Sequence, residues 1–266
     1  MSKTRTITAL LLGDVIGQPG CRALFMGLPQ LIKRLRADIV VVNGENAANG
    51  FGLTEELARQ FFALGVHVIT SGNHIWQQET IRPLLDKDQR ILRPANYPSQ
   101  VLGKGSTIVE IAGSKIGVLN LQGRHQMMPI DCPFQIGLSI VEKMRRQTPL
   151  ILVDFHAELP QEKEALALYL DGKVSVVVGT HTHVQTADER ILPQGTAYIT
   201  DLGMSGPLDG VIGSDPLIAI ERQMTQLPLR SEILDAPSYL QGVVCSIDPA
   251  SGKTISIARI NEQFGV

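Results

Sequence analysis

The chain has 266 residues, of which 44% are hydrophobic and 19% are charged, and its formal net charge at pH 7 is −2. This composition is ordinary for a globular protein, and the chain is expected to form one domain over residues 1–266. The small net charge excludes the broad basic field that drives unspecific nucleic-acid binding, so a nucleotide or RNA partner would have to be recognised locally.

The first apolar run and the cysteines favour a cytoplasmic protein with no membrane partner. The run at 7–12 is too short to span a membrane, and no signal-peptide cleavage pattern accompanies it. Cys21, Cys132 and Cys245 are far apart and odd in number, so reduced thiols are expected and a cysteine-bound zinc site is not. The oligomeric state is not encoded in any motif, which leaves a homo-oligomer open.

Short apolar runs alternate with helical patterns along the chain, which predicts an α/β fold. Strands are predicted at 6–12, 39–42, 66–70, 106–111, 115–121, 150–154 and 174–178. Two further strands, at 241–247 and 254–260, flank a turn-rich segment and predict a terminal antiparallel hairpin. The sheet content is therefore expected to be mixed.

Two helical patterns are clear between these strands. One follows Thr54, a residue suited to cap a helix N-terminus, and ends at Gly65. The other begins near Pro160 and ends at Gly172, and residues 161–164 are expected to form its solvated first turn. Both helices are expected to have a structural role only.

Polar side chains recur just past the predicted strands, where loops at the carboxyl ends of strands can converge on one site. Five such loops carry candidate metal ligands: Gly13-Asp14, Asn43-Gly44-Glu45-Asn46, Ser71-Gly72-Asn73-His74, Phe155-His156-Ala157-Glu158 and Gly179-Thr180-His181-Thr182-His183. Carboxylate, amide oxygen and imidazole together suit manganese, iron or zinc better than calcium or magnesium. Because one tetrahedral ion needs fewer ligands, the set predicts two ions that share a bridging carboxylate and hydrolyse a phosphate ester.

Each motif alone also has a structural explanation. Gly13-Asp14 could be a strand-ending turn, and Asn43-Gly44 is a common turn signal. The most specific element is the pair His181 and His183, because two histidines have little structural reason to follow a buried strand. His67, by contrast, lies inside an apolar run and is expected to be a structural histidine.

The ordered Gly-Asp, Gly-Asn-His and Gly-x-His-x-His elements resemble the calcineurin-type metallophosphoesterase superfamily. Segments 13–17, 42–46, 93–98, 154–158 and 179–190 resemble its YmdB-like branch, over nearly the whole chain. Two positions depart from the wider superfamily: Ile16 stands where its Asp-x-His motif has a histidine, and Glu45 stands where a bridging aspartate is usual. Both departures agree with the YmdB-like branch, in which the asparagine after this glutamate, here Asn46, replaces the lost imidazole.

The resemblance implies a four-layer αββα sandwich, with two mixed β-sheets between helical layers. It also implies a ligand set of seven side chains, in which one ion is bound by Asp14, Asn46 and His183, the other by Asn73, His156 and His181, and both by Glu45. His74 resembles the family's proton donor to the leaving oxygen, a role that suits an imidazole near neutral pH.

The activity implied by the resemblance is phosphodiester hydrolysis, with a small substrate such as the cyclic nucleotide 2′,3′-cAMP. The implied ions are iron or manganese, with zinc as an alternative, and hydroxide activated by the metal would attack the phosphate. A phosphomonoesterase or protein phosphatase could use the same two-metal core. A regulatory or RNA-interacting protein with vestigial catalysis is the second rival, but the full ligand set together with His74 favours an enzyme.

Two segments outside the ligand set are candidates for holding the substrate. Arg93 and Arg124 could bind a phosphate oxygen, and Tyr97 could stack on a base. Asn96 and His125 lie beside them in the same segments. Surface packing explains each of these residues nearly as well.

Overall fold

The structure is a computed structural model that describes residues 5–264. Its strands are β1 (Ile7–Leu12), β2 (Asp14–Val15), β3 (Ile39–Asn43), β4 (Val68–Thr70), β5 (Ser106–Ile111), β6 (Ser114–Gln122), β7 (Ile151–His156), β8 (Val176–Thr180), β9 (Arg190–Ile191), β10 (Ala197–Ile199), β11 (Met204–Pro207), β12 (Ser238–Ile247) and β13 (Thr254–Phe264). Its helices are α1 (Gly17–Leu35), α2 (Glu55–Ala63), a short 3₁₀ helix η1 (Glu79–Ile81), α3 (Arg82–Lys87), α4 (Pro133–Arg145), α5 (Pro160–Leu170) and α6 (Pro216–Thr225). The ends of the predicted 1–266 domain lie outside the described residues, so the extent of that domain stays a prediction.

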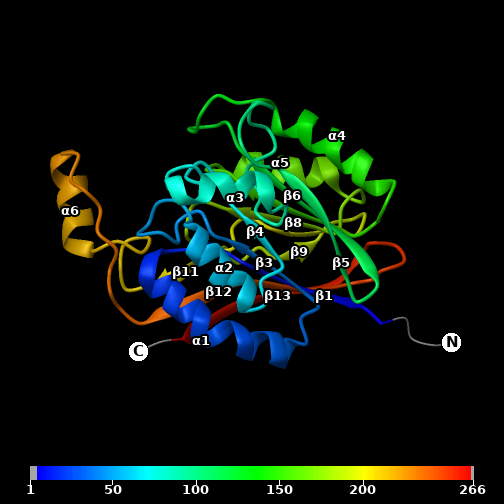
Figure 1. Cartoon of the computed structure of the whole chain (residues 1–266), viewed down its shortest axis with the longest axis horizontal. Helices are drawn as coiled ribbons and strands as arrows, with labels where there is room; N and C mark the ends of the chain where they lie inside the picture. Colours follow the sequence, from blue (N-terminus) through cyan, green and yellow to red (C-terminus); the bar gives the residue numbers. More distant parts are fainter. Residues whose placement is uncertain (1–4, 265–266) are drawn as a thin grey trace.

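Two mixed β-sheets pack face to face, with helices on both outer sides (Figure 1). Seven strands form the first sheet in the order β2-β11-β12-β1-β3-β4, with β13 beside β12, and six form the second in the order β5-β6-β7-β8-β10-β9. In the first sheet β1 is antiparallel to β12 and parallel to β3, and in the second β6 is antiparallel to β5 and parallel to β7. The predicted αββα sandwich with two mixed sheets is therefore confirmed.

Period-two alternation along the central strands fills three apolar layers. In β1, Ala9 and Leu11 face the layer between the sheets, whereas Leu10 and Leu12 face the layer under α1 and α2. In the second sheet, residues alternate in the same way between the layer that separates the sheets and the layer under α4 and α5. Because these strands are buried on both faces, they appear in the sequence as continuous apolar runs.

All nine predicted strands are present, with ends shifted by a few residues, and β12 and β13 form the predicted antiparallel hairpin. The predicted cap of α2 is also confirmed, because Thr54 Oγ1 accepts a hydrogen bond from Leu57 N at 3.2 Å. The prediction of a solvated first turn of α5 is confirmed for Gln161 and Glu164 but is wrong for Glu162 and Lys163, which are buried. Glu162 accepts hydrogen bonds from Arg124 N and His125 N in the loop after β6, and Lys163 donates one to Asp201 after β10.

The longest helix, α1, was not predicted from the sequence. Its segment contains three glycines and two prolines, which are unfavourable in helix interiors. Two of the glycines are needed for packing: a Cβ on Gly20 would lie 2.1 Å from Ser205 O, and one on Gly27 would lie 2.5 Å from the Phe264 ring. The glycines lower the helix propensity of this segment. They also allow α1 to approach the sheet closely, and this packing stabilises the helix in the fold.

Residues 5–264 contain no helix long and apolar enough to cross a membrane. Cys21, Cys132 and Cys245 are free thiols, as predicted, and the first and last are buried.

The layer between the sheets gives a direct test of the sandwich. Leu152 of β7 has no exposed surface in this layer, so Leu152→Ala should lower the free energy of unfolding by about 2–5 kcal/mol. Leu168→Ala on α5 is a matched control, because 53% of Leu168 is exposed, and its effect should stay within about 0.5 kcal/mol. Urea unfolding of both variants provides the measurement, and equal losses would contradict this assignment of the core.

Candidate metal centre

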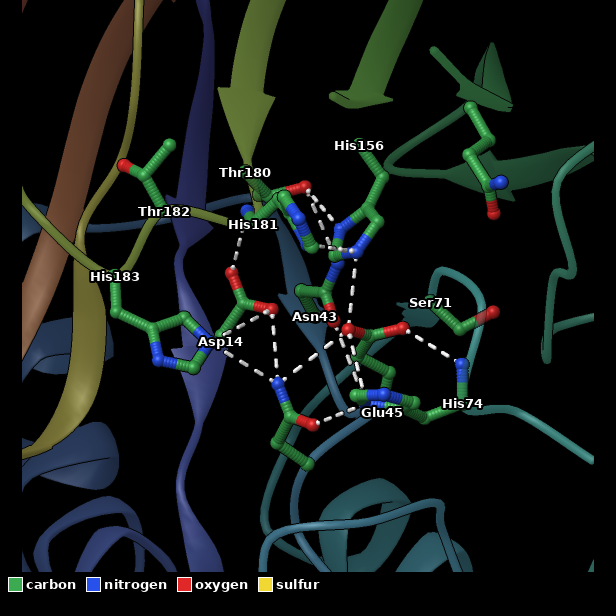
Figure 2. Close-up of polar contacts among 12 residues, drawn as sticks. Asp14, Asn43, Glu45, Ser71, His74, His156, Thr180, His181, Thr182 and His183 are labelled. Atoms are coloured by element: carbon green, nitrogen blue, oxygen red, sulfur yellow. Dashed lines mark hydrogen bonds and ion pairs between the residues drawn. The ribbon is translucent and has the colours of Figure 1, made fainter. Parts of the chain in front are cut away.

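Five strand ends bring polar side chains into one cluster (Figure 2). Asp14 follows β1, Glu45 and Asn46 follow β3, and Asn73 and His74 follow β4, all in the first sheet. The second sheet supplies His156 from the end of β7, and His181 and His183 from the loop after β8. The carboxyl ends of strands from both sheets therefore meet at one end of the sandwich, and the residues predicted from separate loops lie together.

Glu45 lies at the centre of the cluster, with only 1% of its side chain exposed. Its Oε1 is 3.0 Å from His156 Nε2 and 3.6 Å from His74 Nδ1, and its Oε2 accepts a hydrogen bond from His74 N at 3.1 Å. One carboxylate thus contacts groups from both sheets.

Asp14 and His183 lie on one side of Glu45. Asp14 is fully buried, and its Oδ1 is 3.8 Å from His183 Nε2. Asn46 lies between them, with Nδ2 3.2 Å from His183 Nε2 and 3.4 Å from both Asp14 Oδ1 and Glu45 Oε1. The Asn46 oxygen instead faces His74 Nδ1 at 2.8 Å, so ligation of an ion by that oxygen would require the amide to turn over.

His156 and His181 lie on the other side of Glu45, with His156 Nε2 and His181 Nδ1 facing each other at 3.0 Å. Ligand atoms of these two histidines and of Glu45 all lie within 4.8 Å of one another, a spacing that could hold a metal ion. The buried Oδ1 of Asn73 has no hydrogen-bond partner among the described residues. Facing ring nitrogens and an unpaired buried amide oxygen are electron-pair donors that a cation would satisfy, so the residues fit a metal ion.

The outward-facing nitrogen of each histidine ring is also held in place. The three contacts are His156 Nδ1 with Thr180 Oγ1 at 3.0 Å, His181 Nε2 with Glu158 Oε2 at 3.1 Å, and His183 Nδ1 with the Ile212 carbonyl oxygen at 3.2 Å. Thr180 Oγ1 in turn donates to Asp154 Oδ1 at 2.7 Å. Metal-binding histidines are commonly oriented by such outer partners. Sequence reasoning did not give Thr180, Asp154 or Ile212 this role, although the first two lie inside the motifs.

Glycine is required where the loop after β4 approaches the cluster. A Cβ on Gly72 would lie 2.2 Å from His156 Nε2 and 2.4 Å from Glu45 Oε2. Only a residue without a side chain lets Asn73 and His74 reach the cluster from the first sheet.

Charge and burial shift the pKa values of these groups in opposite directions. Burial disfavours the charged form of His156, but Glu45 and Asp14 outweigh it and raise the pKa of His156 to about 9. Burial likewise opposes ionisation of Glu45, yet His156 lowers the pKa of Glu45 to about 2. For Asp14, burial dominates over His183 and raises the pKa to about 6. Burial, together with the charge on His156, lowers the pKa of His181 to about 3.

A cavity of about 370 Å³ opens beside the cluster. Its lining includes Glu45, His74, His181 and His183 from the cluster, and apolar and cationic side chains from the segment around α6. Phe51 packs edge-on against the His74 ring, with 5.1 Å between ring centroids.

The five residues suggested for substrate binding lie elsewhere. Arg93 is buried and donates to the Pro94 carbonyl oxygen at 2.8 Å, and Tyr97 donates to Gln122 Oε1 at 3.1 Å. Among residues 5–264, none of the five lines the cavity beside His74, so the geometry does not support their part in substrate binding. The prediction for His67 is confirmed, because its Nδ1 accepts a hydrogen bond from Val40 N at 3.1 Å.

The αββα sandwich and the ligand-type side chains at its strand ends define the class: this protein is a metallophosphoesterase. Within that class, the family model described as YmdB-like protein matches residues 10–260. The chain belongs to the YmdB-like family.

Two sequence relatives have phosphodiesterase in their names, and one solved structure has the same fold. The chain is 45% identical over 251 residues to a 2′,3′-cyclic-nucleotide 2′-phosphodiesterase from Bacillus subtilis, covering 94% of this chain and 95% of that protein. It is 36% identical over 262 residues to a putative phosphatase/phosphodiesterase from Mycoplasma pneumoniae, covering 96% of this chain and 92% of that protein. The crystal structure of a hypothetical protein from Thermus thermophilus matches with a TM-score of 0.91 and 35% identity, covering 97% of this chain and 100% of that one.

The raised pKa of His156 predicts how metal binding should depend on pH. An ion at Nε2 must displace the proton that His156 holds below about pH 9, so Mn²⁺ affinity should rise by about tenfold per pH unit between pH 7 and 9. Calorimetric titration at pH 7, in two buffers of different ionisation enthalpy, should detect about one released proton per chain from this group.

His67→Asn is the control for this titration, because His67 lies outside the cluster and asparagine still offers Val40 N an acceptor. Its pH dependence should match that of the wild type. A Mn²⁺ affinity that does not change between pH 7 and 9 would contradict the raised pKa of His156.

Proposed function

We propose that this chain is a binuclear metal-dependent phosphodiesterase that hydrolyses 2′,3′-cyclic nucleotides such as 2′,3′-cAMP. The observation that carries the proposal is the convergence of the predicted ligand set around Glu45, with an unpaired buried oxygen on Asn73. The substrate class is supported by the Bacillus subtilis relative, which is named for it and is 45% identical to this chain.

We assign the ligand set to two ions that share one carboxylate. Asp14, Asn46 and His183 would hold one ion, Asn73, His156 and His181 would hold the other, and Glu45 would bind both. Imidazole, carboxylate and amide donors favour iron or manganese, with zinc as an alternative. When bound, the ions would supply Lewis-acid activation of the phosphate and of a water nucleophile.

His74 is suited to protonate the leaving oxygen. Its side chain is 25% exposed and lines the cavity. No hydrogen bond occupies Nε2 among residues 5–264, so this nitrogen can face a substrate. Burial lowers the pKa of His74 and Glu45 opposes that shift. A bound phosphate anion would act in the same direction as Glu45, favour the protonated ring, and so prepare the proton that the ribose oxygen takes as its bond to phosphorus breaks.

The cavity favours a nucleotide over a protein substrate. Its volume of about 370 Å³ lies in the usual range for small-molecule sites, about 300–1,000 Å³. Phe51, Ile212 and Ile233 provide apolar surface for a base, and Arg222 provides a positive charge for a phosphate oxygen. A phosphomonoesterase would use the same core and remains the alternative that the assay below must exclude. A cytoplasmic location and a homo-oligomeric state stay predictions.

The proton-donor role of His74 predicts unequal effects on two substrates. A ribose oxygen leaves as a strongly basic alkoxide, whereas nitrophenolate is stable without a proton. His74→Ala should therefore reduce kcat/KM for 2′,3′-cAMP by about 10²–10⁴ and reduce it far less for bis(p-nitrophenyl) phosphate. Both rates are measured at fixed pH and saturating Mn²⁺, and metal content should stay at two ions.

Equal losses on the two substrates would remove the proton-donor role from His74. Loss of an ion would make His74 a ligand. If the wild-type protein with Mn²⁺ cleaves a phosphate monoester but not 2′,3′-cAMP, the monoesterase alternative is correct.

The bridging role of Glu45 predicts the loss of both ions together. A carboxylate supplies charge to each ion and an amide supplies much less, so Glu45→Gln should weaken both Mn²⁺ sites. Glu56→Gln, an exposed change on α2, is the matched control and should keep two ions. Metal content per chain after dialysis decides the question, and two tightly held ions in Glu45→Gln would show that Glu45 does not bridge them.

A further inference from the structure

A buried ion pair that the proposed chemistry does not use lies beneath the histidine loop. Lys163 Nζ of α5 donates to Asp201 Oδ2 at 2.7 Å, and each side chain is 1% exposed. Removing two charges from water is costly, and an apolar pair of similar size often serves stability equally well. The place of the pair in the fold is therefore informative.

Asp201 fixes the backbone between the two histidines of the loop. Its Oδ2 also accepts a hydrogen bond from Thr182 N at 3.2 Å, and its Oδ1 accepts one from Gly203 N at 2.9 Å. The neighbouring amide, His181 N, donates to Asp14 Oδ2 at 3.2 Å. Two successive N–H groups of the loop are thus held by two buried carboxylates.

The loop needs such restraint because both histidines have unusual backbone angles. The φ angle is 101° at His181 and 64° at His183, a region that residues with a side chain rarely adopt. Conformations of this kind persist only where the surroundings enforce them. This backbone conformation directs the His181 ring toward His156 and the His183 ring toward Asp14.

Lys163 also supports the strand end that leads into the loop. A Cβ on Gly179 would lie 2.7 Å from Lys163 Cδ and 1.8 Å from Thr200 O. The lysine stem therefore packs directly under the last residues of β8, while its ammonium group neutralises the carboxylate that holds Thr182.

We propose that Lys163 and Asp201 are positioning residues for the metal centre. Asp201 holds the backbone of the histidine loop so that His181 and His183 each face their own ion, and Lys163 holds Asp201 in place through their 2.7 Å contact. This inference rests on the proposed ligand roles of His181 and His183. If the pair served stability alone, its loss would destabilise the fold without a specific effect on metal binding.

The test compares metal binding with stability in the full-length, metal-free protein. The double variant Lys163→Met with Asp201→Leu removes both charges and the acceptor for Thr182 N, and keeps apolar bulk. We expect its Mn²⁺ affinity to fall by about 10–100-fold, the usual effect of losing a group that orients metal ligands. Calorimetric titration with Mn²⁺ gives the affinity, and urea unfolding of the metal-free protein gives the stability.

Leu166→Ala is the matched control, because Leu166 lies on the same helix, has no exposed surface and packs in the layer under α5. It should destabilise the fold but leave Mn²⁺ affinity within about threefold of wild type, since it removes no group that orients a ligand. Asp201→Asn serves if the double variant does not fold. It keeps the shape of Asp201 but has one oxygen for two N–H groups, so its Mn²⁺ affinity should also fall.

Wild-type Mn²⁺ affinity in whichever of these Asp201 variants folds would overturn the proposal. An equal loss of Mn²⁺ affinity in Leu166→Ala would show that the ion pair affects metal binding only through the stability of the fold. Failure of the wild-type protein itself to bind Mn²⁺ would instead refute the proposed function, so the two ideas fail separately.

Discussion

The burial of two carboxylates among histidines is the constraint on which the rest of this structure depends. Asp14 and Glu45 are at most 1% exposed, and an unpaired carboxylate in a protein interior costs several kcal/mol. Each is compensated by a backbone N–H, from His181 and His74 respectively, and Glu45 also by His156. The contacts from His181 and His156 run from the second sheet to strand ends of the first. The charges of the site therefore tie the two layers of the sandwich together where no apolar core can.

The metal cluster could be predicted because each of its side chains comes directly at or after a strand that is visible as an apolar run. The helix α1 could not, because its glycines serve contacts with Ser205 and Phe264 that are remote in sequence. Lys163 shows the same limit more sharply. Its position near the start of a helix indicates solvent exposure, and only the three-dimensional fold brings Asp201 within 2.7 Å of it. Local pattern thus predicted the residues of the cluster, whereas the buried partners of these residues depend on tertiary contacts.

The two groups of residues that line the cavity belong to elements that differ in burial. The metal side rests on strands buried on both faces, whereas Arg222 belongs to α6, which has no buried residue and stands away from the sandwich (Figure 1). A ten-residue helix has little stability of its own, so its order depends on few contacts. One of the connections between the sides is the bond from His183 Nδ1 to the Ile212 carbonyl oxygen at 3.2 Å. The residues of the cluster therefore rest on a well-packed framework, whereas the segment around α6 is held by fewer buried contacts.

The positive φ angles of His181 and His183 affect how any substitution there must be interpreted. An alanine removes the ring but keeps the Cβ that this backbone conformation disfavours, so its effect combines a lost imidazole with a change in backbone preference. A glycine removes the ring and adopts the same φ freely. Glycine is consequently the better reference state at both positions. The difference between glycine and alanine variants at one site would measure the conformational energy stored in the loop, on the order of 1–3 kcal/mol for each residue.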